Sequence, residues 1–307
     1  MAVERSMLVI LGPTASGKSA LALDIARRIG GEILSVDSMQ VYRGMDIGTA
    51  KPSALEQSEV RHHLIDVVDP NESFTVARFV ELAETAIGGA AARSAPLVVT
   101  GGTPLYYKAL FEGLFDGPPG DLEIRRRLRL LPNEELMRRL TLVDPAAIGR
   151  IHVNDSKRLV RALEVHELTG KPISSFQTEW ANGKLRHDAV WIGLSWEREL
   201  LNRRVNARVK AMLAAGWLEE TRGLLERYGS LSPTAQEATG YHELIEHLQG
   251  RVSLDDASER IKIATRQLAR RQMKWFRRWM QVNWIAGDRA VGGLADEVFE
   301  IWRRPKP

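Results

Sequence analysis

The chain has 307 residues, of which 44% are hydrophobic and 27% are charged, and its 43 Lys+Arg against 39 Asp+Glu give a formal net charge of +4. This composition excludes collagen-like and intrinsically disordered proteins, and no segment approaches the roughly 18 unbroken apolar residues that a membrane-spanning helix needs. The absence of cysteine excludes disulfide frameworks, thiolate zinc sites, iron–sulfur clusters and a cysteine nucleophile.

The length and the first residues set expectations for organisation and location. At roughly 150 residues per domain, the length favours one large α/β domain with a smaller addition. The segment MAVERSMLVILG lacks the long apolar stretch and the small-residue cleavage site of a signal peptide, which predicts a cytoplasmic protein with no membrane attachment. We expect the protein to be a monomer.

The first part of the chain alternates strand-like and helical segments. An apolar run at residues 7–12 precedes a glycine-rich loop and a stretch with helical spacing, and residues 31–36 and 96–100 are predicted as further strands. Residues 64–68 are a possible short strand, and residues 74–93 show a helical pattern. Strands that alternate with helices predict a doubly wound parallel sheet of the α/β class.

The sequence changes in character after the breaker cluster LFDGPPGD, which follows Gly113. Residues 121–169 show only helical patterns rich in Arg and Glu, and strand character returns at residues 189–195 and 282–285, with helices between. The predicted organisation is a P-loop core of residues 1–115, an inserted all-helical domain of residues 116–187, and a return to the core over residues 188–307 with basic helices near the end.

Residues 12–19, GPTASGKS, match the phosphate-binding pattern G-x-x-x-x-G-K-[ST] completely. Its glycines let backbone N–H groups turn inward around phosphate oxygens at a helix N-terminus. We expect Lys18 to hold the phosphates and Ser19 to hold a Mg²⁺ ion, and a simple tight turn is the weaker alternative. The predicted phosphate-binding residues are Gly12, Pro13, Thr14, Ala15, Ser16, Gly17, Lys18 and Ser19.

The second carboxylate that P-loop NTPases usually carry for Mg²⁺ is missing after the strand at residues 96–100, which is followed by Gly101. The nearest candidate is Asp37, in the segment DSMQVYR after the strand at residues 31–36. An Asp at the carboxyl end of a parallel strand lies where α/β sheets bind ligands, so Asp37 is interpreted as a metal carboxylate or a general base. A turn residue or a helix N-cap is the structural alternative. Thr103 could direct a hydroxyl at the same ligand.

Two adjacent histidines, His62 and His63, are poor candidates for metal ligands. Neighbouring side chains on a strand face opposite ways, and the sequence nearby offers no Cys or second His pair to complete a site.

Arg158 and Arg161 are three residues apart and share a helical face, where their guanidinium groups suit phosphate oxygens. A solvated basic face is the alternative for this pair.

The C-terminal part of the chain concentrates positive charge. Residues 260–278 contain eight basic residues and no acidic one, which favours a polyanionic partner. Spacing by four places part of this charge as a stripe along one helix: Lys262, Arg266, Arg270 and Lys274. Core packing is favoured over base stacking for the neighbouring aromatic residues, Trp275, Phe276 and Trp279.

The order of motifs along the chain closely resembles that of the bacterial tRNA dimethylallyltransferases. They are GPTASGKS, DSMQVYR, IGTAKP, HHLID, GGTPLYYKAL, RIHVNDSKRLVRALEV, GYHEL and TRQLARRQMKWFR, and the resemblance covers essentially the whole length. It implies transfer of a dimethylallyl group from dimethylallyl diphosphate to N6 of adenosine-37, beside the anticodon, in tRNAs that read codons beginning with U. The products would be N6-(dimethylallyl)adenosine and diphosphate.

The resemblance also implies roles for particular residues. Asp37 would be the general base, Thr103 would lie at the reaction centre, and the phosphate loop with Mg²⁺ would stabilise the leaving diphosphate. The helical insertion would hold the anticodon stem of the tRNA. Glu237 and His242 depart from the family pattern, since some relatives carry basic residues there. The implied tRNA contacts are Asp37, Ser38, Met39, Gln40, Thr103, Arg125, Lys157, Arg158, Leu159, Val160, Arg161, Glu237, Ala238, Thr239, Gly240, Tyr241 and His242.

Three other functions share part of this pattern. A small-molecule P-loop kinase would use the same phosphate loop and would differ in taking ATP as donor. A free-nucleotide isopentenyltransferase acting on AMP has less need of a long helical insertion. A nucleic-acid-binding module with a purely structural loop is disfavoured by the presence of Lys18, Ser19, Asp37 and Thr103.

Overall fold

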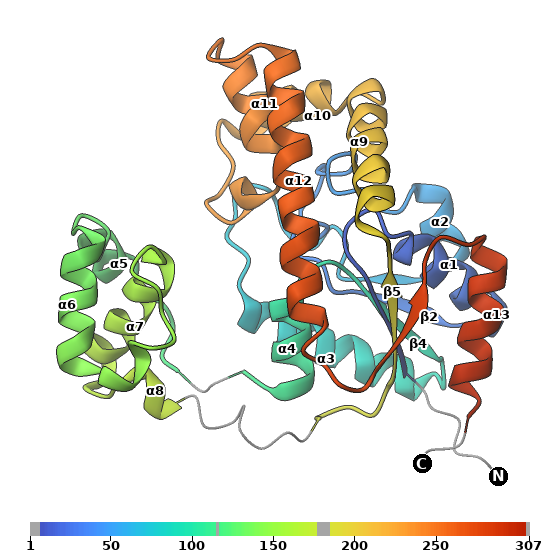
Figure 1. The fold of residues 1–307 in the computed structure, drawn as a ribbon, viewed down its shortest axis with the longest axis horizontal. Coiled ribbons are helices and arrows are strands. Elements are labelled where there is room, and N and C mark those ends of the chain that lie inside the picture. Colours follow the sequence, from blue (N-terminus) through green and yellow to red (C-terminus); the bar gives the residue numbers. More distant parts are fainter. Residues whose placement is uncertain (1–6, 115–116, 177–184, 305–307) are drawn as a thin grey trace. The chain divides into compact units, whose positions relative to one another are not determined.

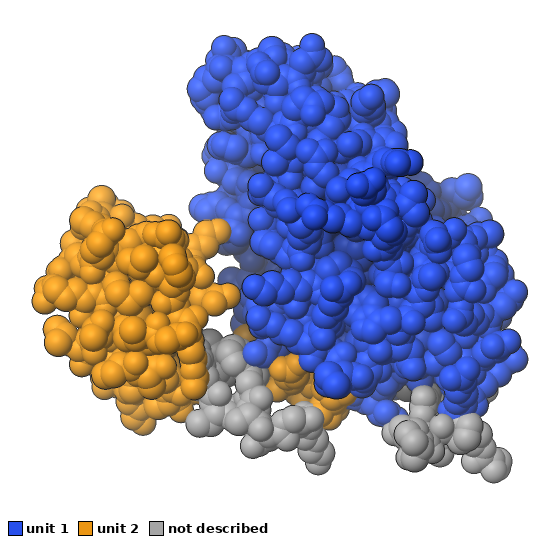
Figure 2. Space-filling model, in the orientation of Figure 1, with its two compact units in different colours: residues 1–110, 187–307 blue, residues 111–186 orange. Residues whose placement is uncertain are grey.

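The chain divides into two units in a computed structural model that describes residues 7–114, 117–176 and 185–304 (Figures 1 and 2). Unit 1 comprises Met1–Leu110 and His187–Pro307, and unit 2 comprises Phe111–Arg186. Unit 2 thus begins a few residues before the insertion expected at residues 116–187 and ends one residue before it. Among the described helices, none is both long and apolar enough to cross a membrane.

Unit 1 is built around a sheet of six strands, and every neighbouring pair is parallel. In spatial order the strands are β3 (His62–His63), β2 (Glu32–Ser35), β4 (Leu97–Thr100), β1 (Met7–Leu11), β5 (Val190–Ser195) and β6 (Val282–Ala286). Every residue of β1, β2 and β4 is buried, as expected for parallel strands with helices on both faces. The doubly wound α/β fold predicted from the sequence is confirmed.

One face of the sheet is covered by α1 (Lys18–Ile29) and α13 (Val291–Trp302) (Figure 1). Alternate strand residues such as Leu8, Ile10 and Ile192 belong to this core because successive strand side chains point to opposite faces. The remaining helices of the first half are α2 (Ala54–Glu59), α3 (Val76–Ala92) and α4 (Pro104–Glu112).

The opposite face has an aromatic core. Trp191 of β5 packs against Trp279, with ring centroids 5.5 Å apart, and Tyr107 of α4 meets the edge of Phe276 at 6.0 Å. Phe276 and Trp279 are buried, which confirms the core packing predicted for them. Trp275 is only half-buried and lies against the guanidinium of Arg278, at 5.1 Å.

A helical group follows β5. It consists of α9 (Arg198–Ala214), α10 (Trp217–Tyr228), the 3-10 turn η3 (Ala235–Glu237), α11 (Tyr241–Leu248) and α12 (Leu254–Phe276). The basic stripe predicted on α12 is not simply a solvated surface. Lys262 is buried and pairs with Glu259, and Arg266 donates to Asn206 of α9 at 2.6 Å. The packing of α12 against α9 therefore involves one of the basic residues of the stripe, Arg266.

The strand expected at residues 64–68 lies instead at residues 62–63. His62 and His63 pair with β2, whereas Leu64 and Asp66 adopt positive φ angles of 63° and 54°, which are incompatible with an extended strand. Val68 makes only an isolated bridge to Tyr42. The prediction was wrong because the apolar pattern does not reveal left-handed turns at non-glycine residues.

In the part of unit 2 that the structure describes, the regular elements after the end of α4 are all helical. They are α5 (Leu122–Leu128), α6 (Asn133–Val143), the 3-10 turn η1 (Pro145–Ala147), α7 (Ser156–Thr169) and α8 (Ile173–Phe176). Leu159 and Val160 of α7 lie in its hydrophobic core at 0% and 3% exposure. The implied tRNA contacts of these two side chains are therefore corrected, since their face of the helix packs inward.

A buried carboxylate ties the helices of unit 2 together. Glu164 is fully buried and accepts from Arg125 at 2.7 Å, from Arg161 at 2.6 Å and from the backbone N–H of Asp121 at 2.7 Å. These donors lower the pKa of Glu164 against the opposing effect of its burial. Arg125 and Arg161, both expected at the tRNA, thus hold a structural carboxylate in this unit.

We expect Leu159→Ala to lower the free energy of unfolding of unit 2 by about 2–5 kcal/mol, because it leaves a cavity in a packed core. Leu130→Ala is the matched control, since Leu130 is 82% exposed, and should change it by less than about 0.5 kcal/mol. Native-state amide hydrogen exchange of α7 measures both. Equal effects of the two substitutions would contradict the assigned core.

Candidate active site

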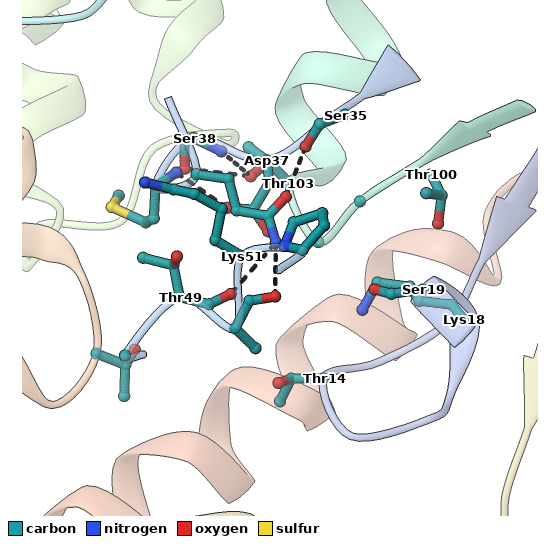
Figure 3. Close-up of a pocket in the computed structure, with 18 of the residues that line it drawn as sticks. Thr14, Lys18, Ser19, Ser35, Asp37, Ser38, Thr49, Lys51, Thr100 and Thr103 are labelled. Atoms are coloured by element: carbon teal, nitrogen blue, oxygen red, sulfur yellow. Dashed lines mark hydrogen bonds between the residues drawn. The ribbon is translucent and has the colours of Figure 1, made fainter. Parts of the chain in front are cut away.

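A pocket of about 490 Å³ opens in unit 1 at the carboxyl edge of the sheet (Figure 3). The ends of β1, β2 and β4 meet there, so the loops that follow these strands form much of its lining. Helices α9 and α12 contribute further lining residues, as do Trp217 and the turn at Glu237. The polar and charged residues of the lining include Thr14, Lys18, Ser19, Asp37, Ser38, Gln40, Thr49, Lys51, Thr103, Arg208, Arg271 and Gln272.

The glycine-rich loop connects β1 to α1, so the strand, loop and helix predicted from the sequence are all present. Gly17 is the N-cap of α1 with φ 90°, a left-handed conformation that favours glycine. The side chain of Ser16 is buried beneath the loop, and a Cβ atom at Gly12 would overlap it. The loop therefore closes around the start of α1, where backbone N–H groups attract anions.

Side chains from other parts of unit 1 form hydrogen bonds with the backbone of the glycine-rich loop. Trp196 donates its indole N–H to Ser16 O at 3.0 Å, and Arg204 of α9 donates to Ala15 O at 2.9 Å while its guanidinium lies 4.4 Å from the Trp196 ring. On the other side, Gln272 of α12 accepts from Thr14 N at 2.8 Å and donates to Gly102 O at 2.6 Å. These contacts fix the loop independently of any ligand.

Positive charge converges beside the loop. Burial and the nearby Arg208 lower the pKa of Lys18 from 10.5 to about 8, against the opposing effect of Asp37, and burial lowers the pKa of Arg208. A second pocket of about 390 Å³ adjoins the first, and the residues described around it include no acid: Ala15, Gly17, Lys18, Ser19, Ala20, Arg204, Ala207 and Arg208. Clustered, partly buried cations of this kind suit a multiply charged anion.

Asp37 lies just beyond β2 and opens a turn rather than a helix, so the N-cap alternative is wrong and the turn alternative describes its backbone. Its Oδ1 accepts from Met39 N at 2.9 Å, which orients the carboxylate. Thr103 accepts from Ser38 N at 2.9 Å and donates to the Ser38 hydroxyl at 3.1 Å. Figure 3 shows Asp37, Ser38 and Thr103 close together, apart from Thr14, Lys18 and Ser19.

Gln40 lines the pocket, but its amide is engaged within the protein. Its oxygen accepts from the Ser35 hydroxyl at 2.8 Å, and its nitrogen donates to Thr49 O at 3.3 Å and Ala50 O at 3.2 Å. Gln40 thus connects the loop after β2 to the segment that follows it.

The segment at residues 237–242 contains residues that line the pocket, an exposed residue and buried residues. Glu237 and Thr239 line the pocket, and His242 is exposed at 3.8 Å from Glu246. Ala238 and Tyr241 are buried, so the implied tRNA contacts of these two side chains are corrected. A Cβ atom at Gly240 would overlap Trp217, which explains the glycine by packing.

Sequence reasoning missed Arg204, Arg208 and Gln272 as parts of this site. The two arginines are four residues apart on the helix that directly follows a predicted strand, which is a signal that the spacing could have given. Gln272 lies in the motif TRQLARRQMKWFR, but only the tertiary structure brings it to a loop 258 residues away. Among the described residues, no group of three His, Cys, Asp or Glu could hold a metal ion.

We expect the affinity of this site for inorganic diphosphate to fall as the pH rises through about 8. Lys18 carries its charge below that pH and loses it above, so Kd should rise by up to roughly tenfold per unit between pH 8 and 10. Titration calorimetry of the unaltered protein and of Lys18→Met measures this, with the variant as control for ionisation of diphosphate. A Kd with the same pH dependence in both proteins would contradict the role of Lys18.

Comparison with known proteins gives consistent matches. A family model described as IPP transferase matches residues 40–279, and one described as Isopentenyl transferase matches residues 5–73. A tRNA dimethylallyltransferase of Geobacter metallireducens is 50% identical over 287 residues, which cover 92% of this chain and 93% of that protein. One of Geobacillus kaustophilus is 45% identical over 303 residues, covering 96% and 94%.

Solved structures agree with these relatives. A tRNA isopentenylpyrophosphate transferase from Bacillus halodurans has a TM-score of 0.71 and 36% identity, with 97% of each chain covered. A eukaryotic dimethylallyltransferase acting on tRNA has a TM-score of 0.82 and 29% identity, covering 98% of this chain and 81% of that chain. Because a family model matches most of the chain and these relatives match nearly all of it, the protein belongs to the IPP transferase family, together with the tRNA dimethylallyltransferases.

Proposed function

We propose that the protein transfers a dimethylallyl group from dimethylallyl diphosphate to N6 of adenosine-37, adjacent to the anticodon, in tRNAs that read codons beginning with U. The products are N6-(dimethylallyl)adenosine and diphosphate. The observation that carries the proposal is that one pocket contains the glycine-rich loop with the cations Lys18 and Arg208 and also the carboxylate of Asp37. An anionic leaving group and a proton acceptor are what this alkyl transfer requires.

The phosphate loop is the donor end of the site. Backbone N–H groups at the start of α1, with Lys18 and Arg208, stabilise the negative charge that grows on the diphosphate as the C1–O bond breaks. The Ser19 hydroxyl lines this end of the pocket and would hold Mg²⁺, because Mg²⁺ prefers oxygen ligands. When bound, the ion supplies further positive charge to the leaving group.

Asp37 is the acceptor end of the site. The N6 amine of adenine forms the new bond to C1 of the donor, the C1–O bond breaks, and the carboxylate of Asp37 takes the proton that N6 loses. The hydrogen bond from Met39 N keeps the carboxylate in place, and the hydroxyls of Ser38 and Thr103 offer polar partners beside it.

The proposed acceptor is an anticodon stem-loop, because an adenine in a duplex cannot present N6 to a protein pocket, whereas a loop base can be splayed out. The exposed basic residues of unit 2, including Lys157 and Arg158 at the start of α7, support contacts to tRNA phosphates. We further propose that the protein acts as a cytoplasmic monomer.

The decisive test incubates the protein and Mg²⁺ with radiolabelled dimethylallyl diphosphate and unmodified tRNA, and then maps the label after nuclease digestion. Label on the adenosine next to the anticodon is expected. Parallel reactions contain AMP as acceptor or ATP as donor. Label on AMP would favour the free-nucleotide isopentenyltransferase, and phosphate transfer from ATP would favour the kinase.

We expect Asp37→Asn to lower kcat by about a hundredfold or more, because it removes the proton acceptor, and to leave the Kd for tRNA within a few-fold. Single-turnover transfer and filter binding measure the two effects. Asp288→Asn is the control, since Asp288 is an exposed carboxylate outside the pocket. Unchanged turnover of the Asp37 variant would remove this residue from the mechanism.

Neutralising Lys157 and Arg158 together should reduce the slope of log K for tRNA against log salt concentration by about 1–2, because each phosphate contact releases counterions. The matched control neutralises Arg138 and Arg139 of α6, two exposed arginines of the same unit that pair with Glu135. The same slope for the unaltered protein and the α7 variant would place the tRNA contacts elsewhere.

A further inference from the structure

The segment at residues 46–51 lines the active-site pocket beside the residues assigned to the acceptor. Gly48, Thr49, Ala50 and Lys51 all belong to the lining. Figure 3 shows Thr49 and Lys51 on the same side as Ser38, away from the phosphate loop. This segment, the acceptor-side loop, contains no helix or strand, so its conformation depends on contacts with the rest of unit 1.

Glu220 of α10 accepts hydrogen bonds from successive backbone N–H groups of this loop. Its Oε2 accepts from Asp46 N at 2.9 Å and from Ile47 N at 2.7 Å, and its Oε1 accepts from Gly48 N at 3.3 Å. The hydroxyl of Tyr241 donates to the same carboxylate at 2.6 Å. A single anionic side chain thus satisfies three adjacent peptide groups, and hydrogen bonds to a charged acceptor are stronger than those between neutral groups.

Aromatic packing limits the alternatives open to the loop. Trp217, one turn before Glu220 on α10, is fully packed, and a Cβ atom at Gly48 would overlap its indole ring. The ring of Tyr241 lies 5.6 Å from that of Trp217, so the same wall also carries the fourth hydrogen bond to Glu220. The loop therefore lies directly against α10, with no space for a different side chain at its closest point.

The far end of the loop is connected to the segment that contains Asp37. Gln40 donates to Thr49 O and Ala50 O, and the ammonium of Lys51 donates to Tyr42 O at 2.8 Å and pairs with Asp46 and Asp66. Displacement of the acceptor-side loop would therefore displace Gln40 and the residues next to it.

The donor end is held by different contacts. The phosphate loop is bound through Trp196, Arg204 and Gln272, and none of the hydrogen bonds described for Glu220 reaches it. Loss of the Glu220 carboxylate should consequently affect one half of the pocket and spare the other.

We propose that Glu220 is a positioning residue that fixes the acceptor side of the pocket, so that the loop base of the tRNA meets a preformed wall. The inference rests on the proposed function. Glu220→Gln keeps the size of the side chain, but its amide nitrogen cannot accept a hydrogen bond, so backbone N–H groups of the loop lose an acceptor. The free energy needed to order the loop must then be supplied by the binding of tRNA.

The test compares Glu220→Gln and Glu220→Asp with the unaltered protein. We expect Glu220→Gln to raise KM for tRNA at least tenfold and to leave the Kd for inorganic diphosphate within twofold. Glu220→Asp, which keeps the charge, should give an intermediate KM and provides the measurement if the Gln variant does not fold. Amide hydrogen exchange at residues 46–48 should accelerate in Glu220→Gln.

Glu219→Gln is the matched control, because Glu219 is the exposed neighbour on the same helix, and it should match the unaltered protein in every measurement. Equal losses of tRNA and diphosphate affinity would reduce Glu220 to a general stabilising role. An unchanged KM for tRNA despite faster exchange would also overturn the inference. Absence of transfer by the unaltered protein would instead overturn the proposed function itself.

Discussion

The parallel arrangement of the strands is the constraint on which the rest of the structure depends. Because all six strands run the same way, the segments after β1, β2 and β4 emerge at one edge, although they are separated by up to about ninety residues of sequence. The first segment provides the phosphate loop, the second Asp37 and the third Thr103. The proposed donor site and the proposed proton acceptor thereby become neighbours because of the sheet topology.

The two ends of this pocket are braced by separate parts of the helical group after β5. Helices α9 and α12 hold the phosphate loop through Arg204 and Gln272, whereas α10 holds the acceptor-side loop through Glu220. This separation matters for a two-substrate enzyme. A small diphosphate and a large RNA place different demands on rigidity, and independent braces allow each half to be preformed without constraining the other.

The sequence predicted what is local and missed what depends on tertiary packing. The positions of the glycine-rich loop and of Asp37 at the pocket could be predicted because each lies within a few residues of the end of an apolar strand. Leu159, Val160 and Tyr241 lie in motifs that resemble tRNA-contacting segments, yet a motif does not state which of its side chains face the core. The partnership of Glu164 with Arg125 joins residues 39 apart, which no spacing rule connects.

The electrostatics of the donor end favour the binding of a diphosphate anion over the ligand-free state. A pKa lowered from 10.5 to about 8 means that the charged form of Lys18 costs about 3 kcal/mol in the free protein. Arg208 contributes to the same cost, because its positive charge lowers the pKa of Lys18. A bound diphosphate would attract both cations and so offset the free-energy cost of their charges. In the proposed reaction, cleavage of the C1–O bond increases the charge on the diphosphate. The same cations would then stabilise the transition state more than the bound donor, which is the condition for catalysis.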